Sequence, residues 1–541
     1  MTGIIGATAG AATAESMADS MFREPWYETE ATGNEGGSVG TVRHGDRDPR
    51  SNTVWSTDSA VAVLDGVVSN LGALGWDRDE LVGRLLDDPD GTLPELEGPF
   101  TVAVVEDDGD VLLATDVAGS RPCYYVPTGG FAFASELTPL LSRLDDVDVD
   151  VREVVDLLAY GSVVGEKTLV EGIDTLPPSM YLRYEDGEVR TERYWYPTFE
   201  TDEATYVDEW IRRHDRSVER VADTVDGPLG LWLSGGLDSR VTAGTLGRVG
   251  REFETFTYAT GEPGTRKAVR ETAATLGVRN REVSVAEIPS EELIRGFETT
   301  VDCLDAMLSF GLGPAIAVMA RDIRDEVDVV SEGGTYLAED VFAYFVENDV
   351  TPVEMLRRSR TKLQPATVQS IVTEPVDPLD SLREHVAHCP PTTPGNQCAD
   401  AVRRFYGYLH MRSNTIQRSQ LGTRQLSPPS FLDHVVSMPL EQRVETLPFT
   451  DGAVPLAVPP LKLAVVRRID DGLEDIPYER TGLAPASARW QHVLGFGTKE
   501  VVKRLRPSGQ SNGIARIQRD DAFRSYLTAL ADDAGGRPFL D

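Results

Sequence analysis

The arrangement of apolar and polar residues changes part of the way along the chain. Up to about residue 197, short apolar runs alternate with turn residues, as in FTVAVVE and VLLAT on either side of DDGD. Asp-Gly between two apolar, β-prone runs is typical of a hairpin turn. The first part of the chain is therefore predicted to consist of short strands joined by turns.

After residue 197 the pattern predicts alternating strands and helices. PLGLWLS, EFETFTYAT and REVSV have the character of strands, DSRVTAGTLGRVG and RKAVRETAATLG that of helices, and DEVDVVSEGG that of a further strand. Such alternation predicts a parallel α/β sheet. A mostly helical region follows, with the Pro-rich stretch HCPPTTPGNQC predicted to be a loop inside it.

Length and charge narrow the class of protein. A chain of 541 residues is too long for one hydrophobic core, so two or three domains are expected. The chain has 88 acidic and 52 basic residues, a formal net charge of −36. Such an acidic surface repels nucleic acid and anionic membranes, which excludes both as main partners. It suits a salt-rich cytoplasm, so we interpret it as halophilic adaptation; the run LDDVDVDVREVVDLL needs no metal, because a solvated strand face or a helix start explains it.

The cysteines indicate a reducing compartment. Cys123, Cys303, Cys389 and Cys398 form no disulfide framework, which favours the cytoplasm. The start of the sequence lacks a secretory signal, and no run of about 18 apolar residues could span a membrane. HVAHC and the later Cys398 are residue types that bind zinc, but their spacing fits no common finger and a plain loop is favoured.

The stretch LWLSGGLDSR carries the clearest chemistry. A strand of a parallel sheet that leads through glycines into a helix exposes backbone N–H groups to an anion. Gly235 and Gly236 let these donors approach closely, and Ser234 and Ser239 add hydroxyl groups. The anion is therefore expected to be phosphate, with Asp238 as a ligand of Mg²⁺ that arrives with a nucleotide. The alternative is a Gly-Gly turn with a capping aspartate.

SGGLDS resembles the pyrophosphate loop of ATP pyrophosphatases, and nearly the whole chain resembles the glutamine-hydrolysing asparagine synthetase family. LEGPFTVAVVEDDGDVLLATDVAGSRPCYY, FAFASEL and LPPSMYLRYEDGEVRTERYWYP match the front-domain pattern of that family and its exit into the synthetase domain. The resemblance implies an α+β Ntn-hydrolase-like sandwich of the class II glutamine amidotransferase type over residues 1–198. It also implies an α/β parallel-sheet domain of the PP-loop type, adenine nucleotide α-hydrolase-like, with a helical C-terminal part over residues 199–541.

The same resemblance implies a reaction and its cofactors. In that family ATP binds with Mg²⁺, a substrate carboxylate attacks the α-phosphate, pyrophosphate leaves, and ammonia displaces AMP from the acyl-adenylate. By this resemblance Tyr258 falls where the second strand approaches the adenine, although a buried strand tyrosine is an equally good interpretation. The implied nucleotide-binding residues are Leu233, Ser234, Gly235, Gly236, Leu237, Asp238, Ser239, Tyr258 and Ser331.

The second acidic motif of the family corresponds to VVSEGGTYLAEDVFAYF. Alignment on Phe342 places Glu339 and Asp340 on the family's acidic pair in reversed order. Either could complete the Mg²⁺ site with Asp238; Asp340 is favoured, and Glu332 and an ordinary acidic helix start stay open as alternatives.

Two basic residues correspond to the closing segment of the family, LKLAVVRRIDDGLEDIPYERTGL. Lys462 falls on an upstream lysine, and Arg480 occupies the position of the lysine that stabilises the adenylation transition state. A guanidinium can still neutralise charge on phosphate, so the role is expected to survive, with a surface arginine as the alternative.

The front domain departs from the family at its glutaminase site. Thr2 replaces the nucleophilic cysteine, and DGVVSN from Asp65 to Asn70 replaces Asn-Gly-Glu-Ile-Tyr-Asn. A threonine hydroxyl can serve as an N-terminal nucleophile. However, a carboxylate at Asp65 would oppose an oxyanion that the family's amide stabilises, so we expect glutamine hydrolysis to be lost.

Three functions are consistent with this sequence. The first is an ATP-dependent amide ligase that activates aspartate or another carboxylate, with ammonia, glutamine or an internal amine as the nitrogen source. The second is a related ligase or cyclase that acts on a secondary metabolite or peptide. The third is a non-catalytic regulatory or scaffold homologue, which the intact SGGLDS disfavours. The expected partners are small molecules, and a homodimer stays open.

Overall fold

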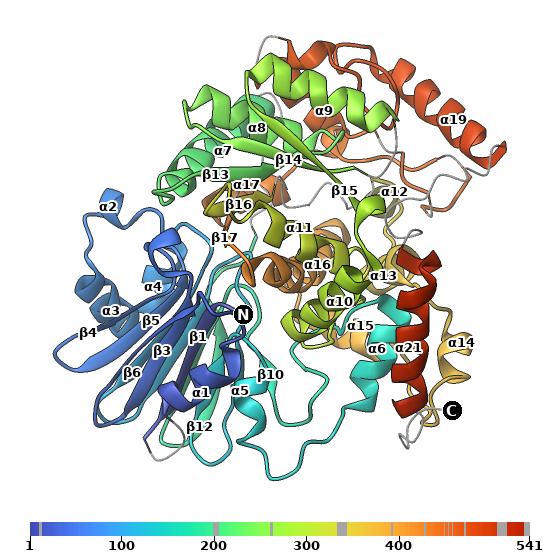
Figure 1. The fold of residues 1–541 in the computed structure, drawn as a ribbon. Coiled ribbons are helices and arrows are strands. Elements are labelled where there is room, and N and C mark those ends of the chain that lie inside the picture. Colours follow the sequence, from blue (N-terminus) through green and yellow to red (C-terminus); the bar gives the residue numbers. More distant parts are fainter. Residues whose placement is uncertain are drawn as a thin grey trace.

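The computed structural model describes residues 1–9, 13–197, 205–259, 263–332, 343–390, 393–426, 429–447, 449–452, 454–456, 458–469, 472–505 and 517–534. The two antiparallel sheets of the front part form one lobe, and the parallel sheet with its helices lies above it (Figure 1). The N-terminus lies at the junction between the front sheets and the later helices (Figure 1).

The front lobe is a sandwich of two six-stranded sheets. Their strand orders are β10-β8-β9-β1-β3-β2 and β12-β11-β7-β6-β5-β4. The strands are β1 (Gly3–Thr8), β2 (Glu28–Gly33), β3 (Gly37–Arg43), β4 (Thr53–Ser56), β5 (Ala60–Gly66), β6 (Phe100–Glu106), β7 (Val111–Thr115), β8 (Tyr124–Val126), β9 (Ala132–Ala134), β10 (Asp174–Thr175), β11 (Met180–Glu185) and β12 (Glu188–Arg193).

The inward side chains of the two front sheets form one core. Ile4 and Val39 of one sheet pack with Val63 and Val105 of the other, and all four are buried. The predicted hairpin is confirmed: β6 and β7 are antiparallel, with Val105 opposite Val111. The alternating apolar positions of these strands therefore decide which face is buried.

The front part also contains helices that the strand-and-turn prediction missed. They are α1 (Ala14–Met21), α2 (Leu71–Leu74), α3 (Arg78–Asp87), α4 (Pro89–Thr92), α5 (Thr138–Leu141) and α6 (Val151–Tyr160). The Asp-Val run is a helix start, as one of its two interpretations proposed: the Asp150 carboxylate accepts a hydrogen bond from the Arg152 N–H at the beginning of α6.

The second lobe contains the predicted parallel sheet. Its order is β15-β14-β13-β16-β17, and every neighbouring pair is parallel. The strands are β13 (Leu229–Trp232), β14 (Glu254–Ala259), β15 (Asn280–Ser284), β16 (Val329–Glu332) and β17 (Gly422–Gln425). Each predicted strand and helix of this region is present, because the apolar runs are long and regularly spaced.

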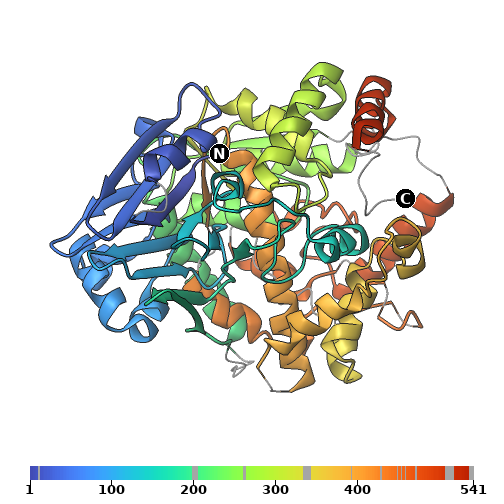
Figure 2. The ribbon, with the colours of Figure 1, turned by 90° about the horizontal axis from the view of Figure 1, so that it is seen from below.

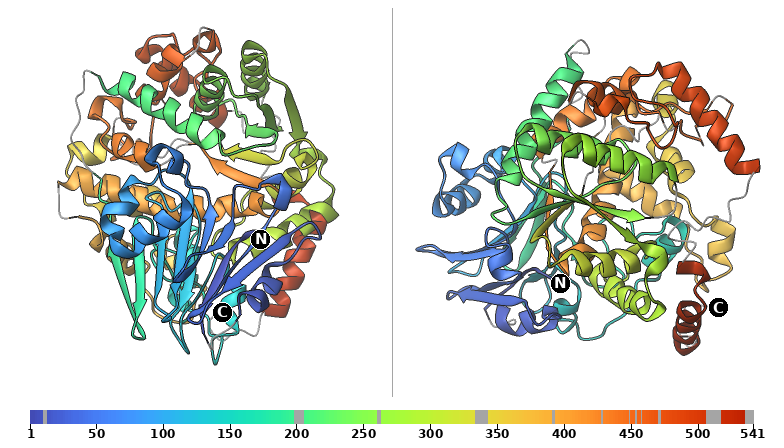
Figure 3. Two further views of the ribbon diagram at one scale, coloured as in Figure 1. Left: turned by 90° about the vertical axis from the view of Figure 1, so that its left-hand side faces the viewer. Right: turned by 45° about the horizontal axis from the view of Figure 1, so that its top comes forward.

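Helices cover both faces of the parallel sheet, as Figures 1 and 3 show. On one face α7 (Tyr206–Ala222), α8 (Asp238–Arg248) and α9 (Pro263–Leu276) bury apolar residues such as Val218, Leu246 and Val269. On the other face α10 (Ser290–Leu304) and α11 (Gly313–Ile323) contribute Leu293 and Val318. Burial on both faces explains why the central strand β13, LGLW, carries no polar side chain apart from the indole N–H of Trp232.

The rest of the chain is helical around a long central helix. Viewed from below, the orange α16 passes through the middle of the molecule (Figure 2). The helices are α12 (Ala343–Glu347), α13 (Pro352–Arg360), α14 (Pro365–Gln369), α15 (Leu379–Ala387), α16 (Pro394–Arg418), α17 (Pro429–Val436), α18 (Pro460–Ile469), α19 (Arg489–Leu505) and α21 (Asp521–Ala534). Among the described residues no helix is long and apolar enough to cross a membrane.

The Pro-rich loop is shorter than predicted. The Thr393 side chain accepts a hydrogen bond from the Asn396 N–H and Pro394 follows at the first helical position, so α16 already includes Cys398. The His385 ring bonds to the Ala401 carbonyl at 2.8 Å and the Cys398 thiol to the Val350 carbonyl at 3.5 Å. All four cysteines are free and buried.

Candidate functional site

The glycine loop lies where β13 ends and α8 begins. The Ser239 hydroxyl accepts a hydrogen bond from the Ser234 N–H at 3.0 Å and lies 3.0 Å from the Ser234 hydroxyl. The Gly236 N–H donates to the Ser234 hydroxyl at 3.2 Å. Ser234 itself is exposed, while Leu233 and Leu237 on either side of the glycines are buried. The buried leucines therefore anchor a loop in which Ser234 stays accessible, while Ser239 is buried at the start of α8.

A basic residue from a distant segment reaches this loop. The Lys462 ammonium, in the first turn of α18, forms an ion pair with the carboxylate of Asp238, the first residue of α8. The two helices share a buried core in which Val241 of α8 and Val465 of α18 both lie. Packing between the two helices thus places a cation beside the carboxylate that begins α8.

The segment that carries Arg480 lies at the same place. Burial raises the pKa of Tyr478 to about 12. The positive charges of Arg480 and Lys462 lower this pKa, and the negative charges of Asp238 and Glu479 raise it. These charged groups therefore all lie near Tyr478. Arg480 is exposed, as a side chain that meets a solvated phosphate would be.

Buried Arg240 fixes this segment to α8. Its guanidinium donates to the carbonyls of Ile476 at 2.7 Å and Pro477 at 3.1 Å, directly before Tyr478. Burial lowers the pKa of Arg240 to about 10, and the charge of Glu479 partly opposes that effect. Arg240 follows SGGLDS immediately, but the sequence did not indicate its role because its carbonyl partners come from a distant segment.

Glu479 and Thr265 also belong to the site, and sequence reasoning missed both. The Thr265 hydroxyl donates to Glu479 Oε2 at 2.7 Å. A Cβ atom at Gly235 would lie 3.0 Å from Glu479 Cδ and 3.0 Å from Thr265 Cα. Gly235 is therefore needed for this close approach, because real Cβ contacts are seldom so short.

The strand ends next to the loop hold the other nucleotide candidates. Tyr258 of β14 lies against Trp232 of β13, with ring centroids 4.3 Å apart. Ser331 of β16 is fully buried and lies opposite Leu231 of β13. Glu339 and Asp340 lie outside the described residues, as does the Glu332 side chain, so the structure places none of these three carboxylates.

The residues that meet at the loop fit Mg·ATP in chemical type. Serine hydroxyls and glycine N–H groups at a helix start suit phosphate oxygens. Lys462 and Arg480 supply positive charge, and Asp238 supplies the oxygen ligand that Mg²⁺ prefers. A strand-loop-helix site at the carboxyl edge of a parallel sheet is the usual place for a nucleotide.

Thr2 lies elsewhere, at the junction of the two lobes. Its hydroxyl donates to the Arg418 carbonyl at 3.1 Å, and its own carbonyl accepts from the Arg418 guanidinium at 3.0 Å. Arg418 also contacts both oxygens of Asp65, at 2.7 and 2.8 Å, and both of these residues are buried. The negative charge expected at Asp65 is thus balanced by a cation from the second lobe.

Little space is left around Thr2. The cavity that Thr2, Asn52, Arg121 and Arg418 help to line has a volume of about 10 Å³, close to that of one water molecule. Burial and the charge of Arg418 lower the pKa of Arg121 to about 9, with Asp65 opposing that shift. A glutamine side chain has no room in this cavity.

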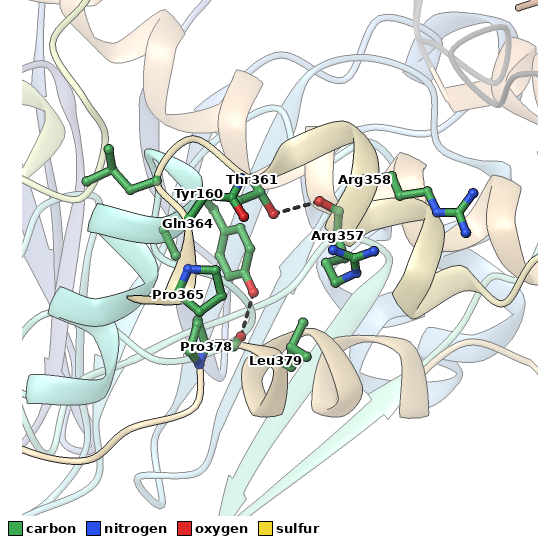
Figure 4. A pocket seen from close by; sticks show the side chains of 10 residues that line it. Tyr160, Arg357, Arg358, Thr361, Gln364, Pro365, Pro378 and Leu379 are labelled. Atoms are coloured by element: carbon green, nitrogen blue, oxygen red, sulfur yellow. Dashed lines mark hydrogen bonds between the residues drawn. The ribbon is translucent and has the colours of Figure 1, made fainter. Parts of the chain in front are cut away.

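A larger cavity lies between α6, α13 and α15, away from the loop. Its volume is about 140 Å³, below the range usual for organic ligands. Figure 4 shows its polar groups paired with one another: the Tyr160 hydroxyl donates to the Pro378 carbonyl at 2.6 Å, and the Thr361 hydroxyl to the Arg357 carbonyl at 2.6 Å. Arg357 and Arg358 both bond to Glu354. These pairings leave no obvious role in ligand binding for this cavity.

In chain order, the fold is an antiparallel sandwich followed by an α/β lobe whose glycine loop is of the kind that binds phosphate. Residues 86–195 match the family model of a glutamine amidotransferase domain, and residues 212–334 match that of asparagine synthase. The chain thus has a two-domain architecture, with a glutamine amidotransferase domain followed by an asparagine synthase domain.

Other comparisons add little. No curated protein sequence matches the chain. The allosteric regulatory enzyme of purine biosynthesis is 12% identical over 47% of this chain, with a TM-score of 0.22, and the match spans 58% of that enzyme. A U34-tRNA thiolase from Methanococcus maripaludis is 12% identical over 60% of this chain and 80% of its own, with a TM-score of 0.21. At these TM-scores the two likenesses say nothing about function.

Proposed function

We propose that the protein is an ATP-dependent amide ligase that activates a carboxylate as its acyl-adenylate. The observation that carries this proposal is the meeting of Asp238, Lys462 and Arg480 at the glycine loop, since the three come from separate segments of the chain. The asparagine synthase match over residues 212–334 supports the same class of reaction. Aspartate is the default substrate, and a carboxylate of a secondary metabolite or peptide is the alternative.

Each residue of the site has a role in this reaction. The loop donors and Ser239 hold the pyrophosphate part of ATP, and Lys462 and Arg480 neutralise charge as the α-phosphorus accepts the substrate oxygen. Mg²⁺, held by Asp238, would neutralise phosphate charge. The bond from the α-phosphorus to pyrophosphate breaks; an amine nitrogen then attacks the acyl carbon, AMP leaves, and the nitrogen loses a proton.

We propose that the nitrogen comes from free ammonia or from an amine of the substrate. The small cavity at Thr2 and the Arg418 side chain bound to Asp65 support a front domain that does not hydrolyse glutamine.

We also propose a domain boundary near residue 198 and a salt-rich cytoplasm as the compartment. The boundary is supported by the two matched regions, which end and begin at residues 195 and 212. The compartment is supported by the net charge of −36 and the four free cysteines.

The decisive experiment measures pyrophosphate and asparagine formation with ATP, Mg²⁺ and aspartate in molar KCl, comparing ammonium with glutamine. Product with ammonium alone is expected. Product with both would show that Thr2 is a working nucleophile and would contradict the proposal that the front domain does not hydrolyse glutamine. Pyrophosphate release with another carboxylate, but not with aspartate, would identify the alternative substrate class. No release with any carboxylate would favour a non-catalytic homologue.

A further inference from the structure

We propose that Asp65 and Arg418 are positioning residues, through which the altered amidotransferase site of the front domain holds the nucleotide site of the second domain in place. This inference rests on the proposed function, because it concerns the binding of ATP. It gives the front domain a role that requires no glutamine hydrolysis.

The first step concerns Arg418, which anchors the end of α16 in the front domain. Arg418 is the last residue of α16, and its side chain enters the front domain to bind the Asp65 carboxylate, which also accepts from the Ser135 hydroxyl at 2.9 Å. The Arg418 carbonyl lies 3.0 Å from the His44 ring nitrogen and accepts from the Thr2 hydroxyl. Side chain and backbone of one residue are therefore both held by the front domain.

The second step leads from the anchor to the sheet. Gln417 precedes Arg418, and its side-chain carbonyl accepts a hydrogen bond from the Trp232 indole N–H at 2.5 Å. Trp232 is buried and is the last residue of β13. Because Arg418 fixes the backbone at the end of α16, it also fixes the position of the Gln417 side-chain carbonyl.

The third step leads to the nucleotide. Trp232 comes two residues before Ser234, the first hydroxyl of the loop, and its ring lies 4.3 Å from that of Tyr258. The indole N–H is thus held by Gln417, and the ring lies against that of Tyr258. Loss of the Gln417 acceptor would leave the buried indole N–H without this partner and let the ring shift, so both the start of the loop and Tyr258 would lose a neighbour held in a fixed place.

The test measures the Kd of Mg·ATP and the Tm of purified variants in molar KCl. Gln417→Leu removes the acceptor while nearly keeping the side-chain bulk, and Trp232→Phe removes the donor together with part of a buried ring, so both should lower Tm; we expect each to raise Kd about tenfold. Asp65→Asn should raise Kd similarly and also lower Tm, since it leaves Arg418 buried without its counter-charge. In the double variant Asp65→Asn with Gln417→Leu, Kd should equal that of Gln417→Leu alone, because both act through one contact.

The matched control is Asp48→Asn. Asp48 forms another buried ion pair between the domains, with Arg424 at 2.5 Å, and Arg424 belongs to β17 rather than to α16. Its loss should lower Tm as Asp65→Asn does and leave Kd unchanged. The inference is overturned if Asp48→Asn raises Kd as much as Asp65→Asn, or if Gln417→Leu leaves Kd within about twofold of wild type. A wild-type protein that does not bind Mg·ATP would instead overturn the proposed function, and the inference with it.

Discussion

The ammonium group of Lys462 contacts the carboxylate of Asp238 beside the glycine loop, although more than two hundred residues separate them in the sequence. Apolar packing between α8 and α18 brings them together. At the start of α8 the helix dipole favours the Asp238 carboxylate, and Lys462 balances its charge. A bound Mg²⁺ would compete with this lysine for the carboxylate and leave the ammonium to face phosphate.

This relationship makes a prediction about turnover. Asp238→Asn should abolish substrate-dependent pyrophosphate release, because it removes the proposed metal ligand. Lys462→Met should lower kcat by roughly 10²–10³-fold, the usual cost of losing one charge-stabilising group. Both are measured as pyrophosphate release at saturating ATP. Lys267→Met is the control, since Lys267 is an exposed lysine of α9 that pairs only weakly with Glu271, and unchanged release by Lys462→Met would contradict the assignment.

A second prediction concerns the close approach at Gly235. In Gly235→Ala the new methyl group would collide with the Glu479 carboxylate and the Thr265 backbone, so the KM for ATP should rise at least about tenfold. In Gly247→Ala, near the end of α8, the new methyl group meets only Leu276 at 3.6 Å. Alanine is the better helix former, so this control should stabilise the fold by about 0.5–1 kcal/mol with KM unchanged. Steady-state kinetics and thermal unfolding of both variants test the contrast.

A third prediction concerns acid sensitivity at the domain junction. Burial lowers the pKa of His44 from 6.5 to about 4, against a hydrogen bond to the Arg418 carbonyl. Above pH 6.5 the ring is neutral in both folded and unfolded chains. As the pH falls from about 6.5 towards 4, the unfolded chain takes up the proton first, and the folded state loses on the order of 3 kcal/mol.

His44→Gln should therefore remove part of the decline in stability between pH 6.5 and 4. Chemical unfolding at several pH values measures this slope. His388→Gln is the control, because His388 is an exposed histidine. Identical slopes for wild type and His44→Gln would show that His44 does not contribute.

A fourth prediction compares two buried aspartates, Asp156 and Asp400, whose pKa values are shifted in opposite directions. Burial and the neighbouring Glu153 raise the pKa of Asp156 well above its usual value. Its folded form therefore holds a proton more tightly than the unfolded chain, and stability falls as the pH rises above about 4. Asp156→Asn, which is always neutral, should raise the free energy of unfolding at pH 7 and flatten this decline.

Asp400 should respond in the opposite direction. Burial raises the pKa of its carboxyl group, but Arg403 and Arg193 outweigh burial and hold it at about 2. Its stabilising effect is present above pH 4 and is lost as the pH falls towards 2. Asp400→Asn should therefore cost about 3–5 kcal/mol at pH 7, because it leaves buried arginines without their partner. Equal effects of the two Asn variants on the free energy of unfolding would contradict both assignments.

Much of the fold follows from local patterns. The β6–β7 hairpin, the strands β13 to β16 and the helices α8 and α9 all coincide with apolar runs and turn residues that are adjacent in the sequence. The front helices were harder to predict. In α3, for example, only Leu81, Val82 and Leu85 are buried, so its apolar face is narrow and its short pattern resembles that of the neighbouring strands.

The sequence by itself determined the glycine loop of the second lobe, because the strand, the two glycines, the hydroxyls and Asp238 are consecutive, and local backbone preferences shape them. Only the tertiary structure decided what surrounds that loop. Lys462, Glu479 and Thr265 reach it through helix packing between distant segments, and Asp65 acquires Arg418 as its partner across a domain boundary. Contacts of this kind depend on how buried surfaces fit together in space, and no short stretch of sequence encodes them.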